Sequence, residues 1–274
     1  MTKAIEDGYN HLVINGTCTE NLLITQFIKS FDGSYSSFGL TSNTPVNSLT
    51  LEGGTLGVWD NTNVGFQASL IYGGVLNIIN LTVSQPLYLN NGARLFVNNS
   101  SLENVSSSDG SSAEINNSTL TCSNSNGCVY LEDSGTLKLD NVTITNSGSS
   151  YTLALARSSS AEIKNSTINN TNTDSDSKPT IGVQSNSSLQ LEDTNVTSNN
   201  NEVSVGTNGY LNLNGGSIKR TNGSPTIKVY DTGIFHNYNS PTFADITCDG
   251  KLATFQNDDS TSTSVTNSNS ADCQ

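Results

Sequence analysis

An acid pair and an arginine are the first groups in this chain whose types and spacing could do chemistry. Glu132 and Asp133 are adjacent, and Arg157 follows Asp133 by 24 residues. Carboxylates beside a cation can exchange protons with a bound substrate, as general acid–base catalysis requires. The alternative is an exposed salt bridge at a chain corner, which is what we expect. These three residues, together with Asp231, are weak candidate catalytic residues.

The densest group of polar and aromatic residues lies between residues 228 and 238. Such a group suits carbohydrate, because an aromatic ring packs against the apolar face of a sugar while polar neighbours bond its hydroxyls. The alternative is that this segment is an irregular end of the fold. The candidate ligand-binding residues are Tyr130, Lys228, Tyr230, His236 and Tyr238.

Metal-binding patterns are sparse. Asp174 and Asp176 form a DxD pair in the polar segment 169–179, as in many calcium loops. A plain polar turn explains the same residues. We therefore expect no cofactor, with calcium at Asp174 and Asp176 as the alternative.

Four of the five cysteines fall into two local pairs. Cys122 and Cys128 bracket a short segment, Cys248 and Cys273 bracket the last part of the chain, and both pairs are predicted to be disulfides. Reduced cysteines are the alternative, whereas zinc is not indicated because Cys122 and Cys128 are too far apart for a CxxC motif. Disulfides favour an oxidising, extracytoplasmic setting. Cys18 is left over, and we expect it to be buried.

One unit that recurs eight times carries these groups. It has two apolar residues at i and i+2, a second such pair eight residues later, and a third apolar position five residues after that. In the last unit the third position falls on Thr242, which departs from the pattern. The units begin at Ala68, Leu87, Val105, Val129, Leu153, Ile181, Val203 and Ile227.

The alternation within each pair is typical of a strand with one buried face. Because the two offsets never change, all variation in unit length, from 18 to 28 residues, falls between the third strand and the next first strand. A period of this length with short strands indicates a solenoid. Three strands, two tight corners and one variable corner predict a parallel β-helix.

An asparagine follows the second pair in most units, at a corner where the chain must bend. Asparagine tolerates the left-handed backbone conformation, and stacked asparagines can hydrogen-bond as a ladder. The corner also explains most Asn-x-Ser/Thr triplets without invoking glycans. The predicted structural ladder contains Asn80, Asn99, Asn117, Asn141 and Asn165.

Outward side chains can be ordered in the same way. Glu114, Lys138 and Glu162 occupy one outward position in consecutive units and alternate in sign, so we interpret them as exposed ion pairs. On the first strand, the outward residues in the middle of the chain are small and uncharged, as at Ala154 and Gly182.

The segments 137–144 (LKLDNVTI) and 163–168 (IKNSTI) resemble the strand, asparagine corner and strand of pectin-lyase-like right-handed β-helix proteins. The segments 13–24 and 49–53 are similar to the first coil of secreted bacterial members. The resemblance implies a single-stranded right-handed parallel β-helix whose first-strand face is the cleft. It leaves the activity open, because the superfamily includes lyases, hydrolases, epimerases, tailspikes, adhesins and structural proteins. The clustered acids that its enzymes use are not recognisable on that face.

We expect one all-β domain of about 8–10 coils. Residues 1–60 are predicted as the N-terminal cap and first coil, 61–247 as the repeats, and 248–274 as the C-terminal cap. The net charge of −13 argues against nucleic acid and anionic lipid as partners. No apolar run is long enough for a membrane span, and no signal-peptide core follows Met1.

The sequence therefore favours a secreted or cell-surface protein that binds glycans or copies of itself, without a recognisable catalytic set. The alternative is a polysaccharide lyase, hydrolase or epimerase that uses Glu132 and Asp133 or a site near Asp231. A tailspike-like receptor-binding protein or a filament subunit is the second alternative.

Overall fold

The computed structural model describes residues 11–18, 23–25, 48–56, 69–123, 127–173, 178–222, 226–239, 241–243, 245–249, 252–258 and 264–268. Every regular element within these ranges is a β-strand. The strands wind into a parallel β-helix, as the spacing of the apolar pairs predicts. Asp174, Asp176 and Cys273 lie outside the described residues.

Three parallel sheets form the walls, because each strand pairs with the equivalent strand one coil away. Sheet A has 11 strands: β1 (His11–Val13), β4 (Ser48–Glu52), β7 (Val75–Ile79), β10 (Arg94–Asn98), β13 (Ser112–Asn116), β16 (Thr136–Asp140), β19 (Ser160–Lys164), β22 (Ser188–Glu192), β25 (Tyr210–Asn214), β28 (Ile234–Tyr238) and β31 (Thr254–Asn257). Sheet B has 10: β2 (Thr17–Cys18), β5 (Thr55–Leu56), β8 (Thr82–Val83), β11 (Ser101–Leu102), β14 (Thr119–Cys122), β17 (Thr143–Asn146), β20 (Thr167–Asn170), β23 (Asn195–Ser198), β26 (Ser217–Arg220) and β29 (Thr242–Phe243). Sheet C has 11: β3 (Leu23–Thr25), β6 (Ser69–Tyr72), β9 (Leu87–Asn90), β12 (Val105–Ser107), β15 (Val129–Leu131), β18 (Leu153–Leu155), β21 (Ile181–Val183), β24 (Val203–Val205), β27 (Ile227–Tyr230), β30 (Asp245–Asp249) and β32 (Ser264–Ser268).

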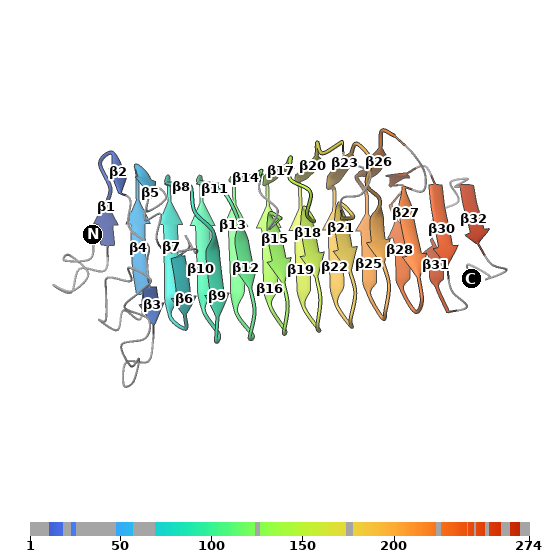
Figure 1. Ribbon diagram of the computed structural model, residues 1–274, viewed down its shortest axis with the longest axis horizontal. Coiled ribbons are helices and arrows are strands. Elements are labelled where there is room, and N and C mark those ends of the chain that lie inside the picture. The colour runs from blue at the N-terminus through green and yellow to red at the C-terminus, as the bar shows by residue number, and fades with distance from the viewer. Residues whose placement is uncertain are drawn as a thin grey trace.

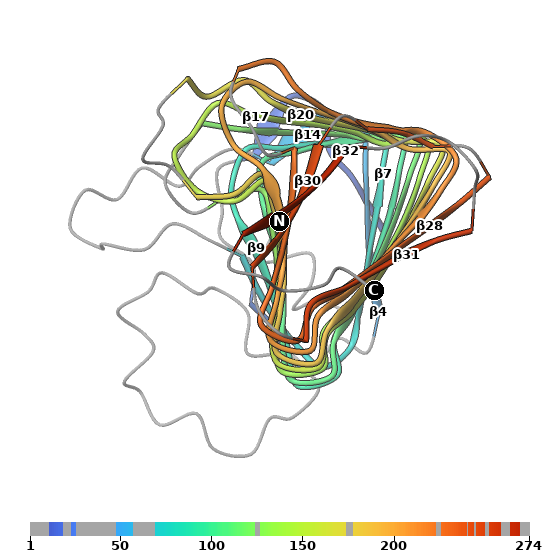
Figure 2. The same cartoon turned by 90° about the vertical axis from the view of Figure 1, so that its right-hand side faces the viewer.

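The coil is right-handed. The strands stack along the long axis from β1 at one end to β32 at the other (Figure 1). Figure 2 looks at the C-terminal end and places sheet A at the right, sheet B at the top and sheet C at the left. A chain that visits A, B and C in this order turns anticlockwise as it advances toward the viewer. This is the right-handed crossover that parallel strands prefer.

Each strand buries alternate side chains. In β16, Leu137 and Leu139 are 2% exposed, whereas Thr136, Lys138 and Asp140 face solvent. Because every coil adds inward residues at the same positions, leucine, isoleucine and valine stack into continuous columns. Burying one such side chain contributes about 1.5–3 kcal/mol, so a narrow core suffices when every coil supplies it.

A left-handed residue turns the chain from sheet A to sheet B. The five predicted asparagines have φ between 50° and 55°. Asn141 Nδ2 donates to Asn117 Oδ1 at 2.9 Å, whereas Asn165 Nδ2 donates to Asp140 Oδ1 at 2.9 Å. The ladder is thus mixed, because corner asparagines bond either to each other or to the last residue of the strand below. The five residues are Asn80, Asn99, Asn117, Asn141 and Asn165.

Left-handed residues also turn the chain from sheet C to sheet A. Between β15 and β16, Asp133 and Ser134 make the bend, with φ of 47° and 67°. Gly135 follows the bend, and a Cβ there would overlap the carbonyl oxygen of Ser107 in the coil below. The small residue is therefore required by close packing between coils.

The predicted register is wrong in two places, at β6 and at the third position of the last unit. In β6, Ser69 and Ile71 pair with Leu87 and Leu89, in place of the predicted Ala68 and Leu70. The corner after β6 is one residue shorter than its equivalents, because Gly73 and Gly74 turn it with φ of 69° and 72°. A fixed offset of eight residues does not detect such a deletion.

The third position of the last unit is Phe243, not Thr242, because Phe243 pairs with Ile218. Its ring lies 5.4 Å from that of Phe235 and 6.3 Å from that of Phe255. These three aromatic rings fill the C-terminal end of the core. Strands also continue through the segments predicted as caps, with β1 to β5 before residue 61 and β31 and β32 after residue 247.

We predict that Asn141→Leu lowers the free energy of unfolding by about 2 kcal/mol, because leucine disfavours a positive φ and the bond to Asn117 is lost. Asn141→Gly keeps the conformation and is expected to cost less than half as much. Glu162→Ala, on an exposed strand position, should change stability by at most about 0.5 kcal/mol. Urea unfolding of the three variants measures these differences, and equal losses for Asn141→Leu and Glu162→Ala would contradict the role of the corner.

Candidate functional site

Four tyrosine side chains lie along the outer face of sheet C. Tyr88 is on β9 and Tyr130 on β15, each between two inward residues of its strand. Tyr151 comes from the loop between β17 and β18, and its ring lies over Gly182 of β21. The ring of Tyr230, from β27, lies over Gly206, which directly follows β24. From β9 to β24 the row spans five strand spacings, or about 24 Å at about 4.8 Å each.

The two glycines determine where the rings lie. A Cβ at Gly182 would come within 2.7 Å of Cε1 of Tyr151, and a Cβ at Gly206 would overlap the ring of Tyr230. Any other residue at either position would push the ring away from the sheet. The hydroxyl of Tyr230 also donates to Oε1 of Gln184 at 3.5 Å, two coils below.

The loop that carries Tyr151 is fixed from both sides. Asn146 is fully buried and donates from Nδ2 to the carbonyl oxygen of Ser150 at 2.9 Å, while its Oδ1 accepts from the amide of Gly148 at 2.9 Å. On the other side, the amide of Cys128 donates to the carbonyl oxygen of Tyr151 at 3.3 Å. The corner before β18 is therefore tied to the segment that ends in Cys128.

Cys122 and Cys128 form a disulfide with their Cα atoms 5.5 Å apart, which confirms this predicted pair. The disulfide closes the corner between β14 and β15, directly beneath the backbone of Tyr151. Cys248 is also disulfide-bonded and fully buried. Its pairing with Cys273 stays a prediction.

Three of the tyrosine phenols, those of Tyr88, Tyr151 and Tyr230, stay protonated at neutral pH because their pKa values are raised. Burial raises the pKa of Tyr88, Tyr151 and Tyr230, and the charge of Glu103 raises the first and that of Glu202 the second. Protonated phenols can donate hydrogen bonds to a ligand.

Charges on sheet C are partly paired. Lys228 Nζ lies 3.4 Å from Oδ2 of Asp249, and Glu202 lies 3.8 Å from Nη1 of Arg220. Lys228 and Tyr230 share this face with Tyr130, so the structure brings three of the five predicted ligand-binding residues together.

His236 and Tyr238 lie on a different face, because they belong to β28 of sheet A. His236 Nδ1 is 3.2 Å from the hydroxyl of Tyr210, and its Nε2 is 2.8 Å from Oδ2 of Asp258. The bond to His236 lowers the pKa of Asp258. The group that is dense in sequence between residues 228 and 238 is thus split between two sheets.

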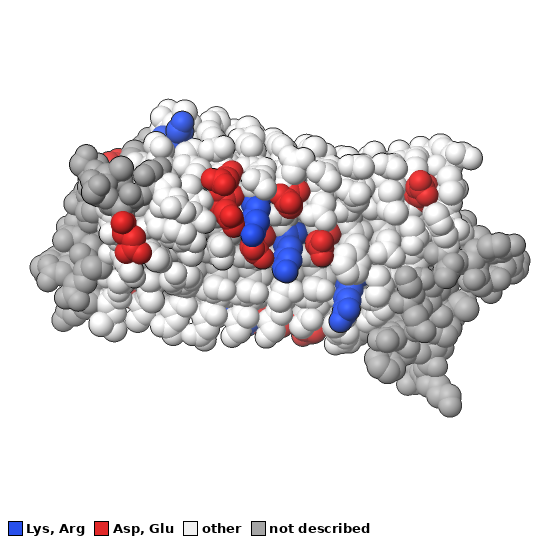
Figure 3. All heavy atoms as spheres, turned by 180° about the vertical axis from the view of Figure 1, so that it is seen from behind, with Lys and Arg blue, Asp and Glu red and all other residues white. Residues whose placement is uncertain are grey.

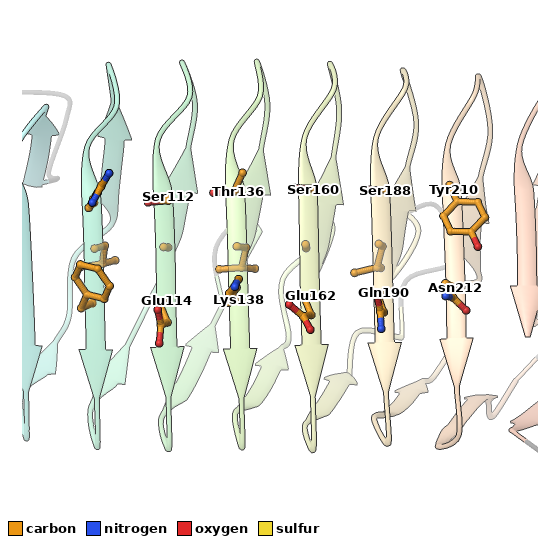
Figure 4. A pocket seen from close by; sticks show the side chains of 17 residues that line it. Ser112, Glu114, Thr136, Lys138, Ser160, Glu162, Ser188, Gln190, Tyr210 and Asn212 are labelled. Carbon is orange, nitrogen blue, oxygen red and sulfur yellow. The ribbon is translucent and has the colours of Figure 1, made fainter. Parts of the chain in front are cut away.

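A groove of about 660 Å³ runs over sheet A from β10 to β25. Figure 4 shows one row of hydroxyl side chains along it, at Ser112, Thr136, Ser160 and Ser188, which ends at Tyr210. A second row alternates in charge and consists of Glu114, Lys138, Glu162 and Gln190.

On the outer face of sheet A, one lysine forms ion pairs with two glutamates. Lys164 Nζ lies 2.9 Å from Oε1 of Glu162 and 3.1 Å from Oε2 of Glu192. The hydrogen bond from Lys164 lowers the pKa of Glu162, and the two carboxylates raise the pKa of Lys164. Lys138 forms no ion pair within the residues that the structure describes. Figure 3 shows acidic and basic side chains gathered near the middle of this face, which is otherwise mostly uncharged.

The candidate catalytic residues lie at the corner between sheets C and A. Arg157 pairs with Oε2 of Glu132 and, at 3.0 Å, with Oδ1 of Asp133, so these groups form a salt bridge between successive coils. Asp231 accepts a hydrogen bond from Thr207 Oγ1 at 3.3 Å. None of these residues lines the sheet A groove or the pocket beside Tyr151.

From the sequence alone, the outward residues of the first strand, Gly182 among them, are simply small and uncharged. The usable signal was a glycine at an outward strand position, which often marks close approach of another group. Tyr151 carries no such signal, because it lies in the variable corner where the repeat makes no prediction.

Among the described residues, no three histidine, cysteine or acidic side chains gather as metal ligands. A search of the same residues finds no helix able to cross a membrane. Comparisons with family models, with curated proteins and with solved structures found no match. The fold is therefore assigned from strand pairing alone.

We predict that Lys164→Met raises the pKa of Glu162 toward its ordinary value of 4.5. Lys138→Met should raise it less, because Lys138 contributes only a weaker charge interaction. Carboxyl NMR titration measures both shifts.

Since the folded pKa of Glu162 is lowered, its ion pair stabilises the protein above the ordinary pKa and loses this contribution as pH falls through the lowered pKa. The stability difference between the wild type and Lys164→Met should therefore narrow in acid. A difference that widens below about pH 4 would contradict the assignment.

Proposed function

We propose that the protein is a secreted or cell-surface β-helix of the pectin-lyase-like superfamily that binds a glycan along sheet C. The observation that carries the proposal is the row of four tyrosines on sheet C. In this row the ring of Tyr151 lies over Gly182 and the ring of Tyr230 lies over Gly206. Sugar rings pack their apolar faces on aromatic rings, and several tyrosines in a row offer repeated contacts to an extended chain. Phenol, amide and serine groups on the same face can bond its hydroxyls.

A neutral glycan fits this face better than a polyuronate. Glu103 and Glu202 act on the tyrosines, and the cation of Lys228 is engaged by Asp249. The chain carries a net charge of −13, which repels polyanions at low salt.

The sheet A groove supports glycan binding less strongly. Its aromatic side chains are Phe96 and Tyr210, at opposite ends, and hydroxyls with alternating charges lie between them. An extracellular location is supported by the disulfide between Cys122 and Cys128, because such bonds persist outside the reducing cytoplasm.

We predict that Tyr230→Ala weakens binding of a neutral oligosaccharide about tenfold, because the loss of one stacking contact is worth about 1.4 kcal/mol. Gly206→Ala should weaken it to a similar extent, since the added Cβ displaces the ring of Tyr230 while the tyrosine itself is kept. Calorimetry of an oligosaccharide panel selected on a glycan array measures the affinities.

Tyr210→Ala, which removes a tyrosine from sheet A, is the matched control and should bind like the wild type. If Tyr210→Ala abolishes binding and Tyr230→Ala does not, the sheet A groove is the glycan site and the assignment to sheet C fails.

The alternative function is cleavage of a polysaccharide. Hydrolysis by two carboxyl groups requires one of them to be protonated. Glu162 in the sheet A groove has a lowered pKa, which favours its charged form, and Glu132 and Asp133 are both engaged in a salt bridge with Arg157. This supports binding over catalysis.

We expect no release of reducing or unsaturated ends from neutral polysaccharides or polyuronates. Cleavage by the wild type that is lost in Glu132→Gln or Asp133→Asn would replace the binding proposal with the enzymatic one. Self-association, as a filament subunit or a tailspike-like oligomer, is the third possibility and is tested by light scattering of the purified chain.

A further inference from the structure

Three of the four tyrosines on sheet C, together with one buried asparagine, line an open pocket of about 370 Å³. Tyr88, Tyr130 and Tyr151 come from three different levels of the solenoid. Asn104, at the corner before β12, lines the same pocket and is only 2% exposed. The pocket therefore differs from the sheet around Tyr230, where a single ring lies over Gly206.

Asn104 has one hydrogen-bonding group without a partner. Its Nδ2 donates to the carbonyl oxygen of Gly127, in the segment closed by the disulfide. Its Oδ1 is buried and accepts no hydrogen bond within the described residues. Because Oδ1 is not accessible to a water-sized group, Asn104 forms part of the pocket wall and leaves the aromatic rings as the groups that meet a ligand.

The charges around the pocket have one prevailing sign. Glu103 acts on the phenol of Tyr88 and Glu202 on that of Tyr151, while Arg220 offsets part of the second charge from 3.8 Å away. The side chains that line the pocket include no lysine or arginine. Aromatic faces attract cations, and this attraction strengthens when the cation is shielded from water.

Three electron-rich rings and nearby carboxylates favour a cation in this pocket. We propose that this pocket binds the protonated amino group of an amino sugar, that is, a hexosamine unit without its N-acetyl group. The inference rests on the proposed glycan binding and specifies which sugar the row of tyrosines selects. Acetylation would remove the charge and add bulk at the nitrogen, so the pocket discriminates between the free and the acetylated amine.

The test uses three oligosaccharides of equal length and linkage, built from glucosamine, N-acetylglucosamine and glucose. At about pH 6, where a sugar amine is protonated, we expect the glucosamine oligomer to bind at least tenfold more tightly than the other two. At about pH 9 the preference should disappear, while affinity for the glucose oligomer stays unchanged. The charged groups near the pocket are Glu103, Glu202 and Arg220, and the glucose oligomer, which has no amine, controls for any change in the protein itself.

Two variants test whether this pocket is the source of the preference for glucosamine. Glu103→Gln should reduce the preference for glucosamine to threefold or less and leave binding of the glucose oligomer close to that of the wild type. Tyr130→Ala also removes a stacking contact, so it should weaken binding of the glucose oligomer and, in addition, reduce the preference for glucosamine to threefold or less. Tyr230→Ala, at the far end of the row, is the matched control and should weaken all three oligomers by the same factor. Asn104 is not substituted, because its bond to Gly127 supports the local fold.

The outcomes separate the two levels of the proposal. Equal affinity for all three oligomers at about pH 6 would overturn the amine inference and leave glycan binding in place. Absence of binding to any oligosaccharide would remove the proposed function as well. Competition by a lysine-containing peptide as strong as that by the glucosamine oligomer would assign the pocket to a polypeptide amine and overturn the choice of an amino sugar.

Discussion

The register between consecutive coils is the constraint on which the rest of this structure depends. A single coil cannot bury its own apolar residues, because each strand is only a few residues long and has one inward face. Burial is complete only when residues such as Leu139 and Ile163 stack at equal positions in neighbouring coils. This requirement fixes the number of residues in two corners, and therefore selects asparagine or glycine where the backbone must become left-handed.

The same constraint explains which parts of the fold the sequence could predict. Inward residues and the asparagine corners repeat at fixed offsets, so strand positions, parallel pairing and the positive φ of Asn141 follow from spacing alone. Errors occur where one corner changes length, as at Gly73 before β7 and at Phe243 after β28. A prediction from fixed offsets assumes that every coil has corners of the same length. It therefore misses an insertion or deletion of one residue in a single coil.

The candidate site was harder to predict, because it depends on contacts between coils that no periodicity encodes. Tyr230 and His236 are six residues apart in the chain yet face different directions, since a corner between them changes the sheet. Tyr151 and Gly182 are far apart in sequence yet touch, since one lies in a variable corner and the other in the coil above. The salt bridge of Arg157 with Glu132 and Asp133 was predictable, because it joins equivalent corners of successive coils.

A solenoid of this kind separates stability from recognition. The inward columns and two of the corners leave little freedom, whereas the third corner tolerates extra residues without disturbing the register. In this chain the third corner contains the disulfide of Cys122 and Cys128 and the loop of Tyr151. On sheet C, glycines at positions 182 and 206 leave room for the rings of Tyr151 and Tyr230. Removing a side chain from an outward position costs the core nothing, because that position faces solvent. It also creates the space in which a ring from another coil can contact the backbone of the sheet. Aromatic contacts can therefore be added to sheet C one coil at a time, and their spacing along the rod follows directly from the strand spacing of about 4.8 Å.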